Sequence, residues 1–216
     1  MLRPLVRCQT NDDHWAIQLP GAQVSFLWSR DRWQHAIHLN AAPTRDSDPL
    51  IASIEGDPTP DAPDRVVSPV FQELHQHDPH PDSGAAVSLL LTGHAVKLFF
   101  SSAVRIGLDP LTFDRGGIEF DTATRCQAPV RMLAASYLVG LGPGSLLDAG
   151  SQRIAWTLPP GGADLLELTA EPPTRLALEA AEGKRCRVLA VAQIAAGLTH
   201  RFRYRWSWAV RSSRTR

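Results

Sequence analysis

Cysteine is scarce in this chain, and its few cysteines lie far apart. The 216 residues include only Cys8, Cys126 and Cys186, and no two of them form a C-x-x-C pair. This spacing argues against a disulfide framework and against a zinc knuckle, so we expect three free thiols. Cys186 stands between two arginines, which predicts a strand residue that faces inward.

Long apolar stretches are also missing. No window of the sequence approaches the roughly eighteen consecutive apolar residues that a membrane helix requires. Residues 1–10 contain no apolar core of the length found in a signal peptide. The sequence therefore predicts no membrane partner and a cytoplasmic location.

The chain has no net charge, because 22 Lys and Arg balance 22 Asp and Glu. Such a chain has no long-range attraction for nucleic acid or for a membrane surface, so a nucleic-acid partner is not expected. The charge is uneven, since the segment from Arg175 onward is strongly basic and residues 1–174 are acidic. We interpret the two segments as parts that interleave in one fold, so that their charges cancel across its surface. An anionic partner is the alternative.

Helical periodicity is nearly absent, and strand-like periodicity replaces it. Runs rich in Val, Ile, Leu and aromatic residues alternate with polar residues at a period of two, and turn residues separate them. The alanine-containing run 188–197 is the best helix candidate, but its β-branched residues favour a strand. We expect about fifteen short strands. They lie near 14–19, 22–28, 33–39, 50–54, 66–75, 85–92, 94–100, 103–107, 117–121, 130–139, 152–158, 164–169, 174–180, 186–195 and 200–210.

These strands predict an all-β fold, a two-sheet antiparallel β-sandwich of the jelly-roll kind with little helix. No repeat or shift in composition divides the chain, so one domain over 1–216 is expected. The segment 41–64, rich in Pro and Asp, predicts a surface loop. Tight turns are expected at Pro20-Gly21, at 92–94 and at 182–184.

A group of histidines is the first candidate site. Glu73, His75 and His77 would project from one face of a strand, and His80 follows in the turn. Imidazoles at i and i+2 can bind a divalent metal ion together with a carboxylate. The H-x-H pair resembles the start of the cupin metal motif, although no Glu lies four or five residues beyond His77. We favour a polar strand end here, so no cofactor is expected, and a divalent metal is the alternative.

Two carboxylates on one strand are the second candidate. Glu119 and Asp121 would share a face, which suits catalysis by paired carboxylates. The E-x-D pattern is similar to that of jelly-roll glycosidases of the laminarinase kind, although no third acid follows in 122–124. The alternative is a solvent-exposed strand face, with Ile118 and Phe120 buried on the opposite side of the strand.

The last strand-like run alternates without a break, with Arg201, Arg203 and Arg205 on one face and aromatic residues on the other. Binding of single-stranded nucleic acid needs arginines and aromatic residues on one surface, and alternation places them on opposite faces. We expect the aromatic face to be buried and the arginines to be solvated, with binding of an anionic ligand as the alternative.

The sequence thus favours a non-catalytic β-sandwich binding module, possible ligands being a carbohydrate or another extended molecule. This step rests on analogy between folds. A metal-dependent or carboxylate-based enzyme on the same scaffold is the alternative, and a protein-interaction module without a small ligand is a third hypothesis. The partner would be a glycan or a protein, and an enzyme is the less favoured class.

Overall fold

The described strands form two antiparallel sheets packed face to face, as the sequence predicts. The computed structural model describes residues 6–39, 48–56, 64–78, 85–109, 115–141, 145–158, 165–182, 185–194 and 197–209. Sheet I contains, in spatial order, β1 (Arg7–Asn11), β2 (His14–Leu19), β3 (Ala22–Ser29), β4 (Arg32–Leu39), β5 (Ile51–Ser53), β11 (Met132–Val139), β16 (Arg185–Val191) and β15 (Arg175–Glu182), with β6 (Arg65–Val66) parallel to β11.

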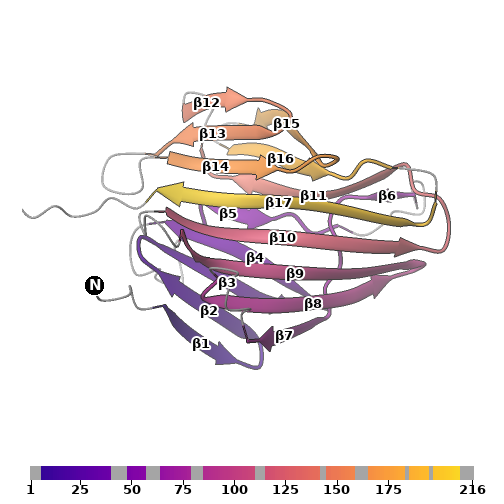
Figure 1. Ribbon diagram of the computed structural model, residues 1–216, viewed down its shortest axis with the longest axis horizontal. Helices are drawn as coiled ribbons and strands as arrows, with labels where there is room; N and C mark the ends of the chain where they lie inside the picture. Colours follow the sequence, from indigo (N-terminus) through magenta and orange to yellow (C-terminus); the bar gives the residue numbers. More distant parts are fainter. Residues whose placement is uncertain are drawn as a thin grey trace, which may run out of the picture.

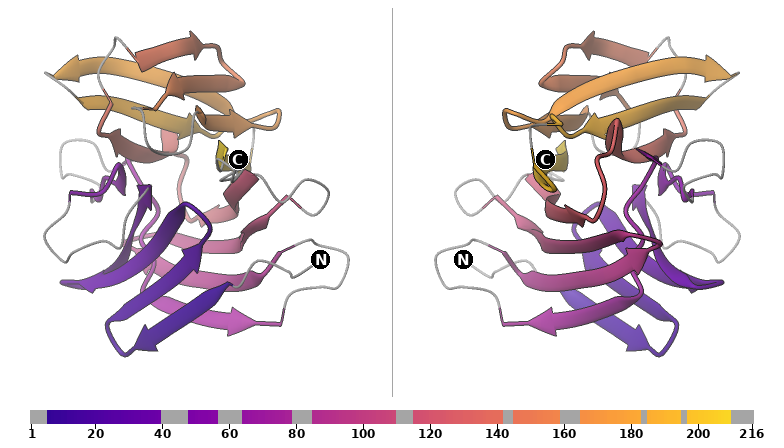
Figure 2. Two further views of the ribbon diagram at one scale, coloured as in Figure 1. Left: turned by 90° about the vertical axis from the view of Figure 1, so that its left-hand side faces the viewer. Right: turned by 90° about the vertical axis from the view of Figure 1, so that its right-hand side faces the viewer.

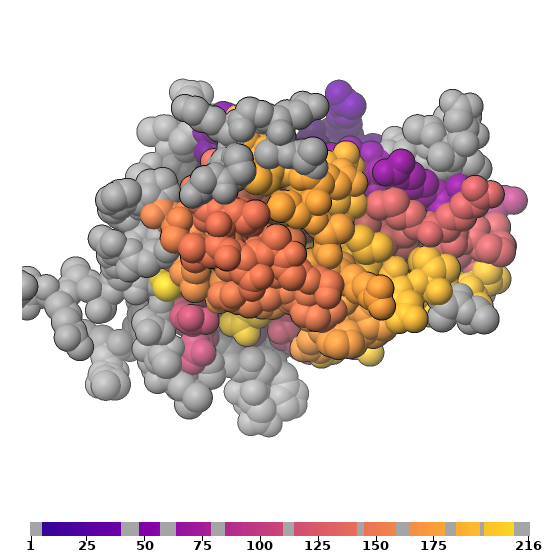
Figure 3. All heavy atoms as spheres, turned by 90° about the horizontal axis from the view of Figure 1, so that it is seen from above, coloured from indigo at the N-terminus to yellow at the C-terminus, as the bar shows by residue number. Residues whose placement is uncertain are grey.

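Sheet II lies in front of sheet I in Figure 1, and the two layers are seen from the side in Figure 2. Its strands are, in spatial order, β12 (Leu146–Ala149), β13 (Arg153–Thr157), β14 (Leu165–Ala170), β17 (Thr199–Ala209), β10 (Arg115–Cys126), β9 (Leu98–Leu108), β8 (Val87–Ala95) and β7 (Glu73–His77). Seen from above, the orange and coral strands of the C-terminal half cover one end of the sandwich (Figure 3). The prediction of an all-β sandwich is confirmed.

Strand β17 shows why these residues form a sheet with one buried face. Exposure alternates along its whole length, and the side chains of Phe202, Tyr204, Trp206 and Trp208 are all at most 3% exposed. Alternate strand residues point to opposite sides, and burying aromatic area is favourable, so the aromatic set enters the core. The predicted face assignment of the last strand is confirmed.

A polar chain crosses the apolar interior. Nε2 of His35 on β4 lies 2.8 Å from the Tyr137 hydroxyl on β11, and that hydroxyl lies 2.7 Å from the hydroxyl of Tyr204 on β17. Burial lowers the pKa of His35 to about 3 and raises the pKa of both tyrosines. The three groups therefore stay neutral, and their side-chain hydrogen bonds link the two sheets.

The predicted turn at 92–94 is wrong, because β8 runs without interruption from Val87 to Ala95. A Cβ at Gly93 would lie 2.3 Å from the carbonyl oxygen of Val70, so this glycine admits a neighbouring backbone instead of making a turn. The turn lies at Val96-Lys97, where Val96 has a φ of 52°. The turn at Pro20-Gly21 is confirmed, with Gly21 at a φ of 73°.

Other strand boundaries differ from the prediction. The run 66–75 divides into β6 and β7, and the sequence patterns missed β1 and β12. Within the predicted loop 41–64, the strand expected near 50–54 is β5, which pairs with β4 and β11, while 41–47 and 57–63 lie outside the described residues. Strands β15 and β16 form a hairpin around the predicted turn 182–184, of which residues 183 and 184 are not described. The run 188–197 begins as strand β16, as favoured.

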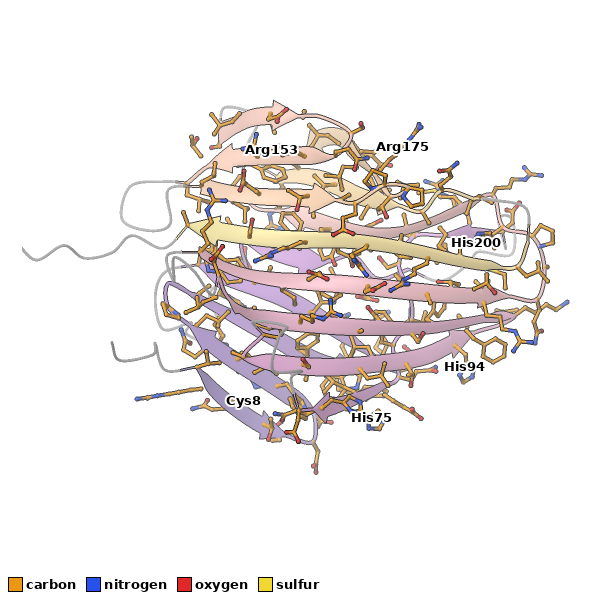
Figure 4. All side chains as sticks on the ribbon, viewed as in Figure 1. Cys8, His75, His94, Arg153, Arg175 and His200 are labelled. Atoms are coloured by element: carbon orange, nitrogen blue, oxygen red, sulfur yellow. The ribbon has the colours of Figure 1, made fainter. Side chains whose placement is uncertain are left out.

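All three cysteines are free thiols, and Cys186 is buried on β16, as predicted. Cys8 is exposed on the edge strand β1 (Figure 4). Within the described ranges, no helix is long and apolar enough to span a membrane.

Candidate functional site

The outer face of sheet I carries a hollow that we call the trough. A row of small residues on three paired strands lies beneath it, formed by Ser25, Ala36 and Ala52, and Ala16 on β2 continues this row outside the lining. Ser25 is only 8% exposed although its strand neighbours Val24 and Phe26 point into the core. A low floor of small side chains between longer ones therefore shapes the trough.

Longer side chains, most of them polar, stand on both sides of this floor. The row His14, Leu27 and Gln34 flanks it on one side, and the row Gln23 and His38 flanks it on the other. The turn between β1 and β2 and Pro49 also belong to the lining. The hollow has a volume of about 820 Å³. Its lining comprises Asn11, Asp12, Asp13, His14, Gln23, Ser25, Leu27, Gln34, His35, Ala36, His38, Pro49, Ala52 and Ser53.

The lining is rich in hydrogen-bonding groups and poor in positive charge. Its described residues include no Lys or Arg, and its formal charges are the carboxylates of Asp12 and Asp13 at the rim. Nδ1 of His38 is buried without a hydrogen-bond partner among the described residues. Burial lowers the pKa of His38, which favours the neutral imidazole. The trough therefore offers uncharged donors and acceptors in its amides, hydroxyls and imidazoles.

The sequence-based search for a site missed the trough. The outward residues are Gln, Ser and Leu on β3 and Gln, Ala and His on β4. Such residues are common on any solvent-exposed strand face. Only the register between strands brings Ser25, Ala36 and Ala52 into one row. The only signal along each of these two strands was one small residue between two longer outward ones.

The predicted arginine and carboxylate candidates meet on the outer face of sheet II. Nε of Arg201 donates to Asp121 at 2.6 Å, and Nη2 of Arg203 donates to the same carboxylate at 2.7 Å. Hydrogen bonds from Arg201 and Arg203 lower the pKa of Asp121 to about 2. A carboxyl group held ionised in this way cannot donate a proton near neutral pH.

Glu119 lies one step along the same face. Its Oε1 accepts a hydrogen bond from Nη1 of Arg105 at 2.9 Å and lies 4.0 Å from Nε of Arg203. Both carboxylates are thus partners of arginines in a surface ion-pair network. This arrangement favours a structural role for Glu119 and Asp121, and their catalytic role stays a prediction.

Arg205 differs from the other arginines of its strand, because no ion pair or hydrogen bond of its side chain occurs among the described residues. It is exposed and stands opposite Glu119 across the β10–β17 pair. A Cβ at Gly117 would lie 2.9 Å from its Nε and 3.0 Å from its Nη2. The side chain of Arg205 therefore lies over the glycine.

The histidine candidates lie on the edge strand β7 of sheet II, far from the ion-pair network (Figure 4). Glu73, His75 and His77 are exposed on one face, as predicted, and Nε2 of His75 lies 3.4 Å from Oε2 of Glu73. No group of three or more His, Cys, Asp or Glu side chains in the described part of the chain is arranged to hold a metal ion. His80 lies outside the described residues, so the four-residue metal site stays a prediction.

This architecture is similar to that of a solved structure. It is the crystal structure of a mutant of the heparan sulfate lyase HepC from Pedobacter heparinus, with a TM-score of 0.55 and 9% sequence identity over 97% of this chain. The chain spans 37% of the length of that lyase. No protein-family model matches the chain, and no curated protein matches it. At this identity the likeness shows a shared β-sandwich fold.

Proposed function

We propose that this chain is a non-catalytic carbohydrate-binding module and that the trough on sheet I holds a stretch of a neutral glycan. The observation that carries the proposal is the trough itself, a hollow of about 820 Å³ whose lining includes amides, imidazoles and hydroxyls. This volume lies within the range of about 300–1,000 Å³ that ligand sites occupy. Sugar hydroxyls both donate and accept hydrogen bonds, and these groups complement them.

Two further features support a sugar ligand. Leu27 is 50% exposed at the side of the trough, where the C–H face of a sugar ring can cover it. The structurally similar protein is a polysaccharide lyase by its name, so a related sandwich occurs in a protein that acts on a glycan. This similarity is one of fold and gives only analogy.

The charge of the lining supports a neutral ligand over an acidic one. A sulfate or a carboxylate in the trough would face Asp12 and Asp13 without a described Lys or Arg in the lining to pair with it. Burying an unpaired charge costs free energy. We therefore expect uncharged sugars to be preferred over the sulfated polymer that the lyase acts on. The expected cytoplasmic location stays a prediction.

Affinity gel electrophoresis of the full chain in a panel of neutral and acidic polysaccharides tests the proposal. At least one neutral polysaccharide should slow the protein, and Gln34→Ala should weaken this binding about three- to tenfold through a lost hydrogen bond. Gln76→Ala, an exposed glutamine on β7, is the matched control and should bind normally. Retardation by acidic polymers alone, or equal effects of both variants, would refute the trough as the site.

A further inference from the structure

One end of sheet II carries exposed apolar side chains on and beside the connections between its strands. Val96 in the β8–β9 turn is 81% exposed, Phe99 near the start of β9 is 46% exposed, and Leu198, directly before β17, is 43% exposed. Two exposed cations accompany them, Lys97 in the same turn and Arg125 near the end of β10. We call these five residues the tip.

Backbone hydrogen bonds hold the connections of the tip together. The amide of Gln127 donates to the carbonyl oxygen of Lys97 at 2.9 Å, and the amide of Cys126 donates to the carbonyl oxygen of Leu198 at 2.6 Å. Figure 4 shows this end of the strands beside the label of His94. The connections around β8, β9, β10 and β17 therefore form one surface.

Val96 has a backbone conformation that its side chain disfavours. Its φ of 52° lies in the left-handed region, where glycine and asparagine are favoured and a β-branched residue is strained. Val96 is also the most exposed of the large apolar residues that the structure describes. Neither feature stabilises the fold, because strain costs free energy and an exposed side chain gains nothing from burial. Strained residues of this kind are typical of functional sites.

Phe99 places a second apolar group on the same end of the face. Its side chain points outward from β9, and its ring stacks on the ring of His94 with the centroids 6.4 Å apart. The next outward residues of β9 are Ser101, Ala103 and Arg105, which are small or charged. Large apolar exposure on β9 is therefore confined to the end where the tip lies.

Positive charge borders these apolar side chains. Arg125 is the direct neighbour of Phe99 across the β9–β10 pair, and Lys97 belongs to the turn itself. The outward carboxylates nearest to them in the strand pairing, Glu73 and Asp121, already accept hydrogen bonds from other side chains. Projecting apolar groups bordered by cations complement a bilayer surface, where anionic headgroups lie above an apolar layer.

We propose that the tip binds the surface of an anionic lipid bilayer. Val96, Phe99 and Leu198 enter the interface, and Lys97 and Arg125 contact the headgroups. An acidic polymer in water would pair with the two cations but would leave the projecting apolar groups uncovered. The sequence-based expectation of no membrane partner considered membrane helices and net charge, whereas this binding depends on a local surface and needs no spanning helix. It is independent of the trough.

The first experiment is sedimentation of the full chain with lipid vesicles. Vesicles made of equal parts of phosphatidylcholine and phosphatidylserine should bind the protein, and vesicles of phosphatidylcholine alone should bind it much more weakly. Rising salt should weaken the binding, because ions screen the headgroup charge. No binding to the mixed vesicles, or equal binding to both kinds, would overturn the proposal.

Val96→Asn tests the apolar part of the contact. Asparagine tolerates a positive φ, so this variant should fold at least as stably as the wild-type protein. Its affinity for the mixed vesicles should fall about tenfold, since less apolar area enters the bilayer. Leu147→Asn is the matched control, because Leu147 is 59% exposed on β12 at the far edge of sheet II (Figure 1). Equal losses in the two variants would refute the tip as the site.

Charge variants test the other part. Lys97→Gln and Arg125→Gln should each weaken binding to the mixed vesicles about fivefold, the effect of one cation near an anionic surface. Arg175→Gln, which removes an exposed cation from β15 of sheet I, is the control and should bind normally. Losses in the charge variants without a loss in Val96→Asn would show a purely ionic contact, as with an acidic polymer, and would refute the bilayer as the partner.

Discussion

The two outer faces of the sandwich differ in how they use polar residues. On sheet I, uncharged side chains flank a floor of Ser25, Ala36 and Ala52, and a hollow remains open between them. On sheet II, arginines and carboxylates bind one another across neighbouring strands, and Asp121 is the centre of that network. The Asp121 side chain is 7% exposed, but its two arginines reach solvent, which screens these ion pairs. Screened ion pairs contribute little to stability, so the two faces should differ little in their contributions to stability.

The largest effect should come from the core that both faces share. Trp206 is fully buried against Tyr137 and Trp156, with ring centroids 5.3 and 6.0 Å away. Trp206→Ala should lower the free energy of unfolding by about 3–5 kcal/mol. Arg205→Ala, the next residue on the outer face, should change it by less than about 0.5 kcal/mol. Denaturant unfolding of both variants measures this, and similar losses would show that the outer face of sheet II contributes to stability.

Acid should reveal the inward-facing histidine of sheet I. The pKa of His35 is lowered to about 3 in the folded chain, so the unfolded chain binds a proton first as the pH falls below about 6.5. The stability contributed by neutral His35 is complete above pH 6.5 and is lost as the pH falls toward 3. We expect a loss of about 3 kcal/mol between pH 6.5 and 4.

The His35→Gln variant should lose most of this pH dependence, since its amide is not protonated. Exposed His75 serves as the control, and His75→Gln should keep the wild-type slope. Unfolding free energies of the wild-type protein and both variants, measured at several pH values, test this prediction. An unchanged slope in His35→Gln would mean that another group causes the acid sensitivity.

Sheet II should respond only at much lower pH and by less. The pKa of Asp121 is lowered to about 2, so its ion pairs stabilise the fold fully above about pH 3.8 and are lost as the pH falls toward 2. The Arg201 side chain is 65% exposed, and solvent screens the pair. Asp121→Asn should therefore cost about 1 kcal/mol at pH 7.

This cost should disappear as the pH approaches 2, because the wild-type carboxyl is then also neutral. Asp12→Asn at the rim of the trough should change stability by less than about 0.5 kcal/mol at either pH. Unfolding curves at pH 7 and at pH 2–3 provide the comparison. A cost for Asp121→Asn that persists at low pH would assign it to packing and not to charge.

Period-two alternation was sufficient to predict the fold class and the buried face of β17. It also placed Glu119 and Asp121 on the outer face, together with the arginines of β17. Alternation decides which side of a sheet a residue faces, and the burial of aromatic area decides which side is the core. Both effects depend on residues within one strand, so they can be predicted from a single sequence.

The partners across strands could not be predicted in the same way. The sequence does not show that Ser25 lies beside Ala36, or that Arg205 covers Gly117, because both depend on the register between strands. Gly93 illustrates the same difficulty, since its sequence suggests a turn and its actual role is to admit the backbone of Val70. Sites formed by rows across a sheet are therefore harder to predict than sites formed along one strand.

The most direct measurement places one tryptophan on each outer face and compares binding of a neutral polysaccharide. Ala36→Trp would fill the trough on sheet I, and Ala103→Trp would add the same bulk to the exposed face of sheet II. In affinity electrophoresis, Ala36→Trp should lose its retardation, while Ala103→Trp should migrate like the wild-type protein in the presence and absence of the polymer. Retained binding in Ala36→Trp, or a loss confined to Ala103→Trp, would contradict the assignment of the glycan site to the trough.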